Sequence, residues 1–214
     1  MRPWSGRPLL AGSARAWAVG LLAGCAVILI VLGVLFAGQG TADPFDRAVD
    51  APLLGWFTSH PLLALRMAYP ATLVPAGAAS LIAALACLAR GWLRGAALAL
   101  LAVPLASGIN DAILKPLFHR TYLGQLTYPS GHTAAISALA AALTVLLLPS
   151  LPAAFRWVIP AAAWLLVAVV AVGVIGVRWH YFTDTIGGAA LGTGTVCGLA
   201  LLLDLRPGRH SLRR

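Results

Sequence analysis

Polar residues gather in three short clusters of an otherwise apolar chain, and each cluster holds side chains that could do chemistry. The clusters are residues 115–120, 128–133 and 178–184. An ionisable group at membrane depth is costly, so in such a chain it is a functional candidate by default. The histidines, acids, hydroxyls and cations of these clusters are suited to acid–base or nucleophilic chemistry on an anionic group.

The middle cluster has the residues of an anion site at the start of a helix. Pro129, Ser130 and Gly131 directly precede an apolar stretch. The Ser130 hydroxyl can cap that helix, and free amides near Gly131 can face an anion. His132 falls in the first turn and can face the same anion. Pro-Ser-Gly is also an ordinary helix-initiating turn, so alone it does not indicate catalysis.

The third cluster has a histidine and an aspartate four residues apart, His180 and Asp184. On a helix they share one face, so the carboxylate can accept the proton of one imidazole nitrogen. The other nitrogen is then free as a nucleophile or base. The plain alternative is the start of a membrane-surface helix, in which Asp184 complements the helix dipole.

The cations near these groups are Lys115, Arg120 and Arg178. A planar arginine fork and a lysine point charge are what a phosphate requires. Cations at helix ends are usually snorkelling anchors, and we interpret Arg47 and Arg66 in that way.

Two further ionisable residues belong to the same region. Asp111 lies four residues before Lys115 and can orient it, although simple pairing at a helix end is equally compatible with the spacing. His119 is adjacent to the first cluster, and we interpret it as structural.

The elements that position these residues are membrane-spanning helices. The chain has 214 residues, of which 60% are hydrophobic and 10% charged, and its mean hydropathy is +0.89. These values are far from those of soluble domains and predict an all-α integral membrane bundle, one domain over 1–214. Six stretches have the length and apolarity of a span: 17–37, 71–89, 96–114, 133–148, 157–177 and 185–203.

The distribution of cations predicts how the bundle is oriented. Cytoplasmic loops carry an excess of lysine and arginine. With the N-terminus inside, the outer face holds five cations, Arg47, Arg66, Lys115, Arg120 and Arg178. The cytoplasmic segments then hold ten, namely Arg2, Arg7, Arg15, Arg90, Arg94, Arg156, Arg206, Arg209, Arg213 and Arg214. Both termini are therefore expected in the cytoplasm, and all three polar clusters fall on the outer face. This convergence is the strongest argument for a single active site.

The remaining segments carry little chemistry. Residues 39–70 are too polar and too rich in proline to span, and we expect a short helix on the outer surface there. The tails 1–15 and 205–214 are basic. A net charge of +9 without a basic run indicates a membrane surface and not nucleic acid as partner. Cys25, Cys87 and Cys197 lie in separate apolar stretches, which argues against a disulfide framework or a cysteine metal cluster.

This constellation resembles the type 2 phosphatidic acid phosphatase superfamily of membrane lipid phosphatases. That family has six spanning helices and three signatures: Lys, six residues, Arg-Pro; then Pro-Ser-Gly-His; then Ser-Arg, five residues, His, three residues, Asp. Residues 129–132 match the second signature, and His180 and Asp184 match the end of the third. The resemblance implies that His180 becomes phosphorylated, Asp184 orients it, and His132 protonates the leaving alkoxide.

The chain departs from this pattern at both signature arginines. Tyr122-Leu123 stands where the family has Arg-Pro, and Gly173-Val174 stands where it has Ser-Arg. We interpret Arg120 and Arg178 as displaced phosphate ligands, because a buried phosphate without cationic partners is electrostatically costly. The alternative is a degenerate member of the family with an altered substrate or no activity.

The sequence thus predicts a metal-independent and cofactor-independent phosphatase of the cell membrane, active on a lipid phosphate or pyrophosphate at the outer face. The expected phosphate-binding residues are Lys115, Arg120, Ser130, Gly131 and Arg178. The surrounding membrane lipids are its other partners.

Three alternatives stay open. A lipid phosphotransferase would share every site residue. A non-catalytic lipid-binding protein would explain the two missing arginines. A zinc hydrolase could use His132, His180, Asp184 and His119 as ligands. The identity of the lipid and the oligomeric state do not follow from the sequence.

Overall fold

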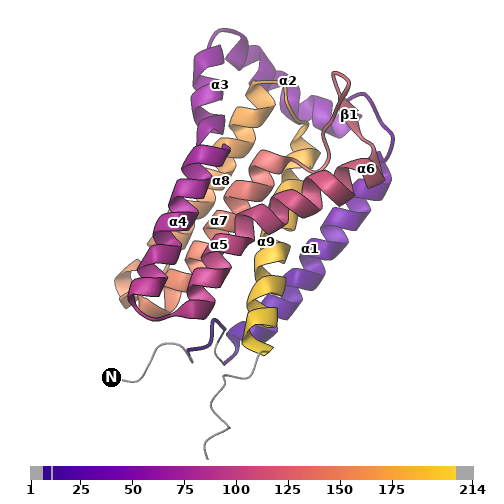
Figure 1. Ribbon diagram of the computed structural model, residues 1–214. Helices are drawn as coiled ribbons and strands as arrows, with labels where there is room; N and C mark the ends of the chain where they lie inside the picture. The colour runs from indigo at the N-terminus through magenta and orange to yellow at the C-terminus, as the bar shows by residue number, and fades with distance from the viewer. Residues whose placement is uncertain (1–6, 11, 206–214) are drawn as a thin grey trace, which may run out of the picture.

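The protein is an all-α bundle, as the sequence predicts, with one two-residue hairpin at one end (Figure 1). The computed structural model describes residues 7–10 and 12–205. In this part of the chain, six helical segments are long and apolar enough to cross a membrane: Ala14–Phe36, Pro61–Ala89, Leu93–Phe118, Gly131–Ser150, Ala153–Gly176 and Phe182–Leu205. All six predicted spans are present in the order expected.

The second segment begins ten residues earlier than expected, at Pro61 and not at Ala71. It consists of α3 (Pro61–Ala68), a 3-10 turn, η2 (Tyr69–Ala71), and α4 (Leu73–Ala89). A proline is well tolerated in the first turn of a helix, and the 3-10 turn carries the chain past Pro70 without ending the segment. Of the stretch 39–70, only α2 (Pro44–Thr58) forms a separate helix outside the six segments.

The other helices complete the bundle. They are α1 (Ala14–Phe36), α5 (Leu93–Ile109), α6 (Lys115–Phe118), α7 (Gly131–Leu147), α8 (Val158–Gly176) and α9 (Phe182–Leu205). A π-helical turn, η3 (Asn110–Leu114), joins α5 to α6, and two short 3-10 turns, η4 (Leu148–Ser150) and η5 (Ala153–Phe155), connect α7 to α8. Strands β1 (Thr121–Tyr122) and β2 (Gln125–Leu126) pair antiparallel between α6 and α7.

Both ends of the described chain lie at the same end of the bundle (Figure 1). The Asp204 carboxylate near the end of α9 accepts hydrogen bonds from the amides of Leu9 and Leu10 at 3.0 and 2.9 Å. Helix α2, the hairpin and α6 lie at the opposite end. An even number of spans returns the chain to the side where it began, so the six spans agree with the position of the two described ends. Arg2 and the basic tail 206–214 lie outside the described residues.

Helices α7 and α9 approach so closely that their backbones touch. A Cβ atom added at Gly188 would collide with the carbonyl oxygen of Ser130, and one at Gly192 with that of Ala134. Small residues permit this kind of approach between helices in lipid. The Ser130 amide also donates to the carbonyl oxygen of Asp184 at 2.9 Å. The second and third polar clusters are thereby held side by side.

Candidate active site

One cavity of about 880 Å³ brings the three polar clusters together. Lys115 of the first cluster, Gly131 and His132 of the second, and His180 of the third all line it. Its remaining lining is mainly apolar and comes from α4, α5 and the hairpin. The expectation of a single site formed by distant clusters therefore has a structural basis.

His180 and Asp184 are close, but they do not form the direct hydrogen bond that their spacing suggests. Nδ1 of His180 is 3.7 Å from the nearer carboxylate oxygen of Asp184. The Thr127 hydroxyl lies between them, 2.9 Å from that Nδ1 and 2.5 Å from the same carboxylate oxygen. The helical premise does not apply, because His180 precedes α9 and only Asp184 is in its first turn.

Asp184 is buried and held on both oxygens. Its second oxygen accepts a hydrogen bond from Nη1 of Arg120 at 2.7 Å. The other guanidinium nitrogen of Arg120, Nη2, lies 2.5 Å from a carboxylate oxygen of Asp46 on α2. The Tyr181 amide donates to the Asp184 carboxylate at 3.0 Å, so this acid also binds the backbone directly before α9.

Arg120 is fully buried and is not among the residues that line the cavity. Its guanidinium lies between two aromatic rings, 4.3 Å from the centroid of Phe36 and 4.5 Å from that of Tyr181. It pairs with Asp184 and Asp46, and Asp43 is a third carboxylate 3.7 Å from Nη2. Arg120 therefore has the position of an ionic brace, a buried cation that holds Asp184 in place. This position differs from that of a displaced phosphate ligand, because the guanidinium does not face the space where a substrate would lie.

The start of α7 has the predicted cap. The Ser130 side chain accepts a hydrogen bond from the Thr133 amide at 3.3 Å and is itself fully buried. Gly131 and His132 follow on the cavity side. The His132 ring stacks on Trp179 with centroids 5.0 Å apart, and its centroid lies 6.3 Å from that of His180. Two imidazoles thus share the cavity close to the start of α7.

Lys115 lies beside Gly131. A Cβ atom placed on Gly131 would be 4.0 Å from Nζ of Lys115. Asp111 orients this lysine, with its carboxylate 2.9 Å from Nζ, and Asn110 donates to the same carboxylate oxygen at 3.0 Å. Asn110 and Asp111 begin the π-helical turn η3, a type of distortion that is frequent at functional sites, and Lys115 directly follows it. The pairing expected from the four-residue spacing is present.

Arg178 and His119 lie apart from the cavity lining. Both have left-handed backbones, with φ of 62° and 49°, and both are exposed. Arg178 lines an adjoining pocket of about 420 Å³ that shares only Trp179 with the main cavity. His119 ends α6, which fits its interpretation as structural. Within the described residues, no three His, Cys, Asp or Glu side chains are grouped as metal ligands would be.

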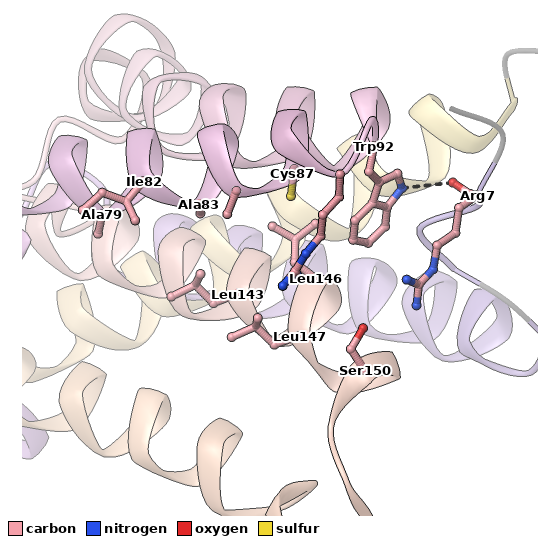
Figure 2. Close-up of a pocket in the computed structure, with 12 residues that line it drawn as sticks. Arg7, Ala79, Ile82, Ala83, Cys87, Trp92, Leu143, Leu146, Leu147 and Ser150 are labelled. Carbon is pink, nitrogen blue, oxygen red and sulfur yellow. Dashed lines mark hydrogen bonds between the residues drawn. The ribbon is translucent and has the colours of Figure 1, made fainter. Parts of the chain in front are cut away.

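A separate cavity of about 390 Å³ lies beside Arg7, near the first described residues of the chain (Figure 2). Apolar residues of α4 and α7 line most of it, with Arg7 and Trp92 at one end. The Trp92 indole donates to the backbone carbonyl of Arg7 at 3.1 Å. Its described lining contains no histidine or acid, so the groups suited to catalysis are those of the larger cavity.

The fold is that of a transmembrane phosphatase. The chain is similar to the first transmembrane PAP2-type phosphatidylglycerolphosphate phosphatase from Bacillus subtilis, with a TM-score of 0.63 and 16% identity. The similarity covers 88% of this chain and 98% of that one. The model of the PAP2 superfamily matches residues 17–206, and the chain belongs to that family. No curated protein matches the sequence. The resemblance drawn from the motifs is therefore confirmed.

Proposed function

We propose that the protein removes phosphate from a lipid phosphate or pyrophosphate through a phosphohistidine at His180. The observation that carries this proposal is that His180 and His132 line one cavity together with Lys115 and Gly131. The family supports a membrane phosphatase acting on lipids.

The proposed reaction has two steps. Nε2 of His180 attacks phosphorus while the bond from phosphorus to the lipid oxygen breaks, and His132 gives a proton to that departing oxygen. Water then attacks phosphorus, the Nε2–phosphorus bond breaks, and His132 takes a proton from the water. Both displacements are in line, so little covalent chemistry is needed beyond positioning and charge stabilisation.

Lys115 and the Gly131 amide are the proposed phosphate ligands in the cavity. Ser130 supports the turn that presents this amide, because its buried hydroxyl holds the Thr133 amide. Arg178 is proposed to contribute positive charge from the adjoining pocket. Arg120 is proposed to act through Asp184, because its buried guanidinium binds that carboxylate and does not line the cavity.

The apolar part of the cavity suits a lipid tail. Ala76 of α4 and Leu100 and Val103 of α5 are among the apolar residues that line it. Ligand sites are typically concave and mostly apolar, with a few polar groups that fix orientation. Phosphatidylglycerolphosphate, which the Bacillus relative acts on by its description, is the first glycerolipid to test.

The active site is proposed to face away from the cytoplasm, on the ten-to-five asymmetry of the cations. This orientation would let the enzyme act on lipid phosphates of the outer leaflet.

A non-catalytic lipid phosphate-binding protein is the second candidate. The observation in its favour is that Lys115 is the single Lys or Arg side chain in the described lining of the cavity. A phosphate dianion there has fewer cationic partners than the family signatures supply.

Phosphate release by the purified protein decides between these candidates. Glycerolipid, sphingolipid and polyprenyl phosphates are each incubated with the protein in the presence of chelator, and His180→Ala serves as the inactive control. Free phosphate from at least one lipid supports the phosphatase, and transfer to an added lipid acceptor supports a phosphotransferase. Binding of these lipids without turnover would reject the proposal in favour of the binding protein. Turnover lost in chelator and restored by zinc would reject the metal-independent mechanism.

A further inference from the structure

The Thr127 hydroxyl occupies the position between the candidate nucleophile and its acid. Thr127 is 1% exposed, does not line the cavity, and belongs to none of the three signatures. Its Oγ1 has three neighbours at hydrogen-bond distance: Nδ1 of His180 at 2.9 Å, a carboxylate oxygen of Asp184 at 2.5 Å, and the Trp179 carbonyl oxygen at 3.3 Å.

The geometry determines where the protons lie. A hydroxyl has one hydrogen to donate and two lone pairs to accept with. The contact with Asp184 is the shortest of the three, and Nη1 of Arg120 donates to the other oxygen of this carboxylate at 2.7 Å, so the carboxylate is an acceptor on both sides. The hydroxyl therefore donates to Asp184. Its lone pair then faces Nδ1 of His180, so Nδ1 carries a hydrogen and Nε2 has the free electron pair.

A direct bond between the two residues is excluded by distance. At 3.7 Å, Nδ1 of His180 and the oxygen of Asp184 are beyond hydrogen-bond range. Any influence of the carboxylate on the imidazole tautomer must pass through a bridging group. Thr127 is the described residue whose side chain contacts both.

Arg120 binds both the backbone of Thr127 and the carboxylate of Asp184. The Thr127 amide donates to the Arg120 carbonyl oxygen at 2.9 Å, while the Arg120 guanidinium binds Asp184 at 2.7 Å. One residue thus fixes the backbone that carries the hydroxyl and the carboxylate that receives its hydrogen. The hydroxyl cannot shift toward one partner without disturbing this closed arrangement.

We propose that Thr127 is a positioning residue that couples Asp184 to His180 by a hydroxyl relay. The inference rests on the proposed function. When Nε2 bonds to phosphorus and the lipid oxygen leaves with the proton of His132, the ring retains its Nδ1 hydrogen and becomes positively charged. The relay stabilises this charge by passing the Asp184 interaction to Nδ1–H. When water displaces the ring, the electron pair returns to Nε2 and the ring is neutral again.

Three variants test the relay. Thr127→Val removes the hydroxyl at nearly constant volume, Thr127→Ser keeps it, and Thr185→Val removes a hydroxyl that is likewise buried in the first turn of α9 but donates only to the Phe182 carbonyl. We expect kcat to fall roughly tenfold to a hundredfold in Thr127→Val, as when a group that orients a functional histidine is lost. KM should hardly change, because Thr127 does not touch the cavity. Thr127→Ser and Thr185→Val should stay within a few fold of the unaltered protein.

The ¹⁵N chemical shifts of His180, assigned by comparison with His180→Ala, give a readout that does not need turnover. We expect the Nδ1–H tautomer in the unaltered protein and in Thr127→Ser, and a mixture of tautomers in Thr127→Val. An unaltered kcat in Thr127→Val would overturn the relay, and so would an equal loss in folded Thr127→Ser. If no lipid phosphate is hydrolysed at all, the proposed function fails, while the tautomer of His180 still tests the relay separately.

Discussion

Arg120 is fully buried and pairs with three carboxylates: Asp184 and Asp46, which are fully buried, and Asp43, which lies 3.7 Å from Nη2 and is partly exposed. Its nitrogens contact Asp184 at 2.7 Å and Asp46 at 2.5 Å, and Thr183 also binds both Arg120 and Asp46. Removing one partner of a buried ionic group leaves the others desolvated and unpaired, which costs far more than losing an exposed pair. The guanidinium therefore matters to the stability of the fold as well as to Asp184.

We expect Arg120→Ala to destabilise the protein by about 3–5 kcal/mol, because two buried carboxylates lose their cation. Unfolding in detergent, followed by denaturant or heat, measures this loss. Adding Asp46→Asn should recover part of it, since one of the two unpaired charges is then absent. Arg178→Ala is the matched control, as Arg178 is exposed. A fully stable Arg120→Ala variant would contradict the role of a buried brace.

The two histidines should differ in their dependence on the leaving group. His132→Ala should be severely impaired on a lipid phosphate, because general acid catalysis typically contributes about 10²–10⁴-fold and an alkoxide needs that proton. On nitrophenyl phosphate the same variant should recover much of its activity, since the phenol is a weak base. His180→Ala should be inactive on both. Steady-state rates on the two substrates measure this, and the same pattern in both variants would mean that the two roles are assigned wrongly.

At the scale of elements, the contact between α7 and α9 determines the geometry of the site. Gly188→Ala places a Cβ against the Ser130 carbonyl oxygen, and a backbone atom cannot move aside easily. We expect a destabilisation of about 1–3 kcal/mol, as for overpacking, and a loss of activity because Ser130 and His132 are displaced. Gly198→Ala is the control, since its nearest neighbour would be at 3.9 Å. Equal thermal stability of the two variants would argue against a tight contact at Gly188.

Helix α2 carries a titratable residue, Asp50, close to the ion pairs of Arg120. Burial, and then the nearby Asp46 carboxylate, raise the pKa of Asp50 to about 7. The unfolded chain has the ordinary value of 3.8, so between these two values the folded state binds more protons than the unfolded state. This group therefore makes the protein less stable as pH rises from about 4 to about 7, and has no further effect above that.

Asp50→Asn should remove this pH dependence. We expect the variant to gain stability over the unaltered protein as pH rises from 4 to 7, and to keep a constant advantage at higher pH. The difference in melting temperature between the two proteins, measured at pH 4.5, 6 and 8, checks the sign. A difference that shrinks with rising pH would contradict a raised pKa.

The helices were largely predictable from the sequence, because twenty-residue apolar stretches have few other interpretations. The start of the second span was not, since Pro61 and Pro70 suggest breaks that the helix in fact accommodates. At the site, the sequence predicted Lys115, Gly131, His132 and His180, which line the cavity, but not Thr127 and Asp46, which bind Asp184 and Arg120 from outside it. Thr127 and Asp184 are 57 positions apart, and Arg120 and Asp46 are 74 apart, so local spacing carries no information about these contacts.

At the scale of the whole molecule, the side of the membrane that holds the cavity stays a prediction. Leu123 is 79% exposed in the hairpin at the cavity end. In a background without the three native cysteines, Leu123→Cys should react with an impermeant thiol reagent added to intact cells, because the cation asymmetry places this end outside. Ser150→Cys, exposed at the opposite end, should react only after lysis. The reverse pattern would place the active site in the cytoplasm.

The pairing of α1 with α9 has a consequence for biosynthesis. Helix α1 packs mainly on α9 (Figure 1), which is translated after the other five segments. Until then most of the α1 surface that α9 covers is exposed to lipid, and its mean hydropathy of 2.9, the highest of the six segments, is compatible with that exposure. Arg120 and Asp46 meanwhile lack Asp184 and Thr183, which α9 carries. A nascent chain stalled before α9 would therefore present unsatisfied charges, and we expect membrane quality-control proteases to remove it.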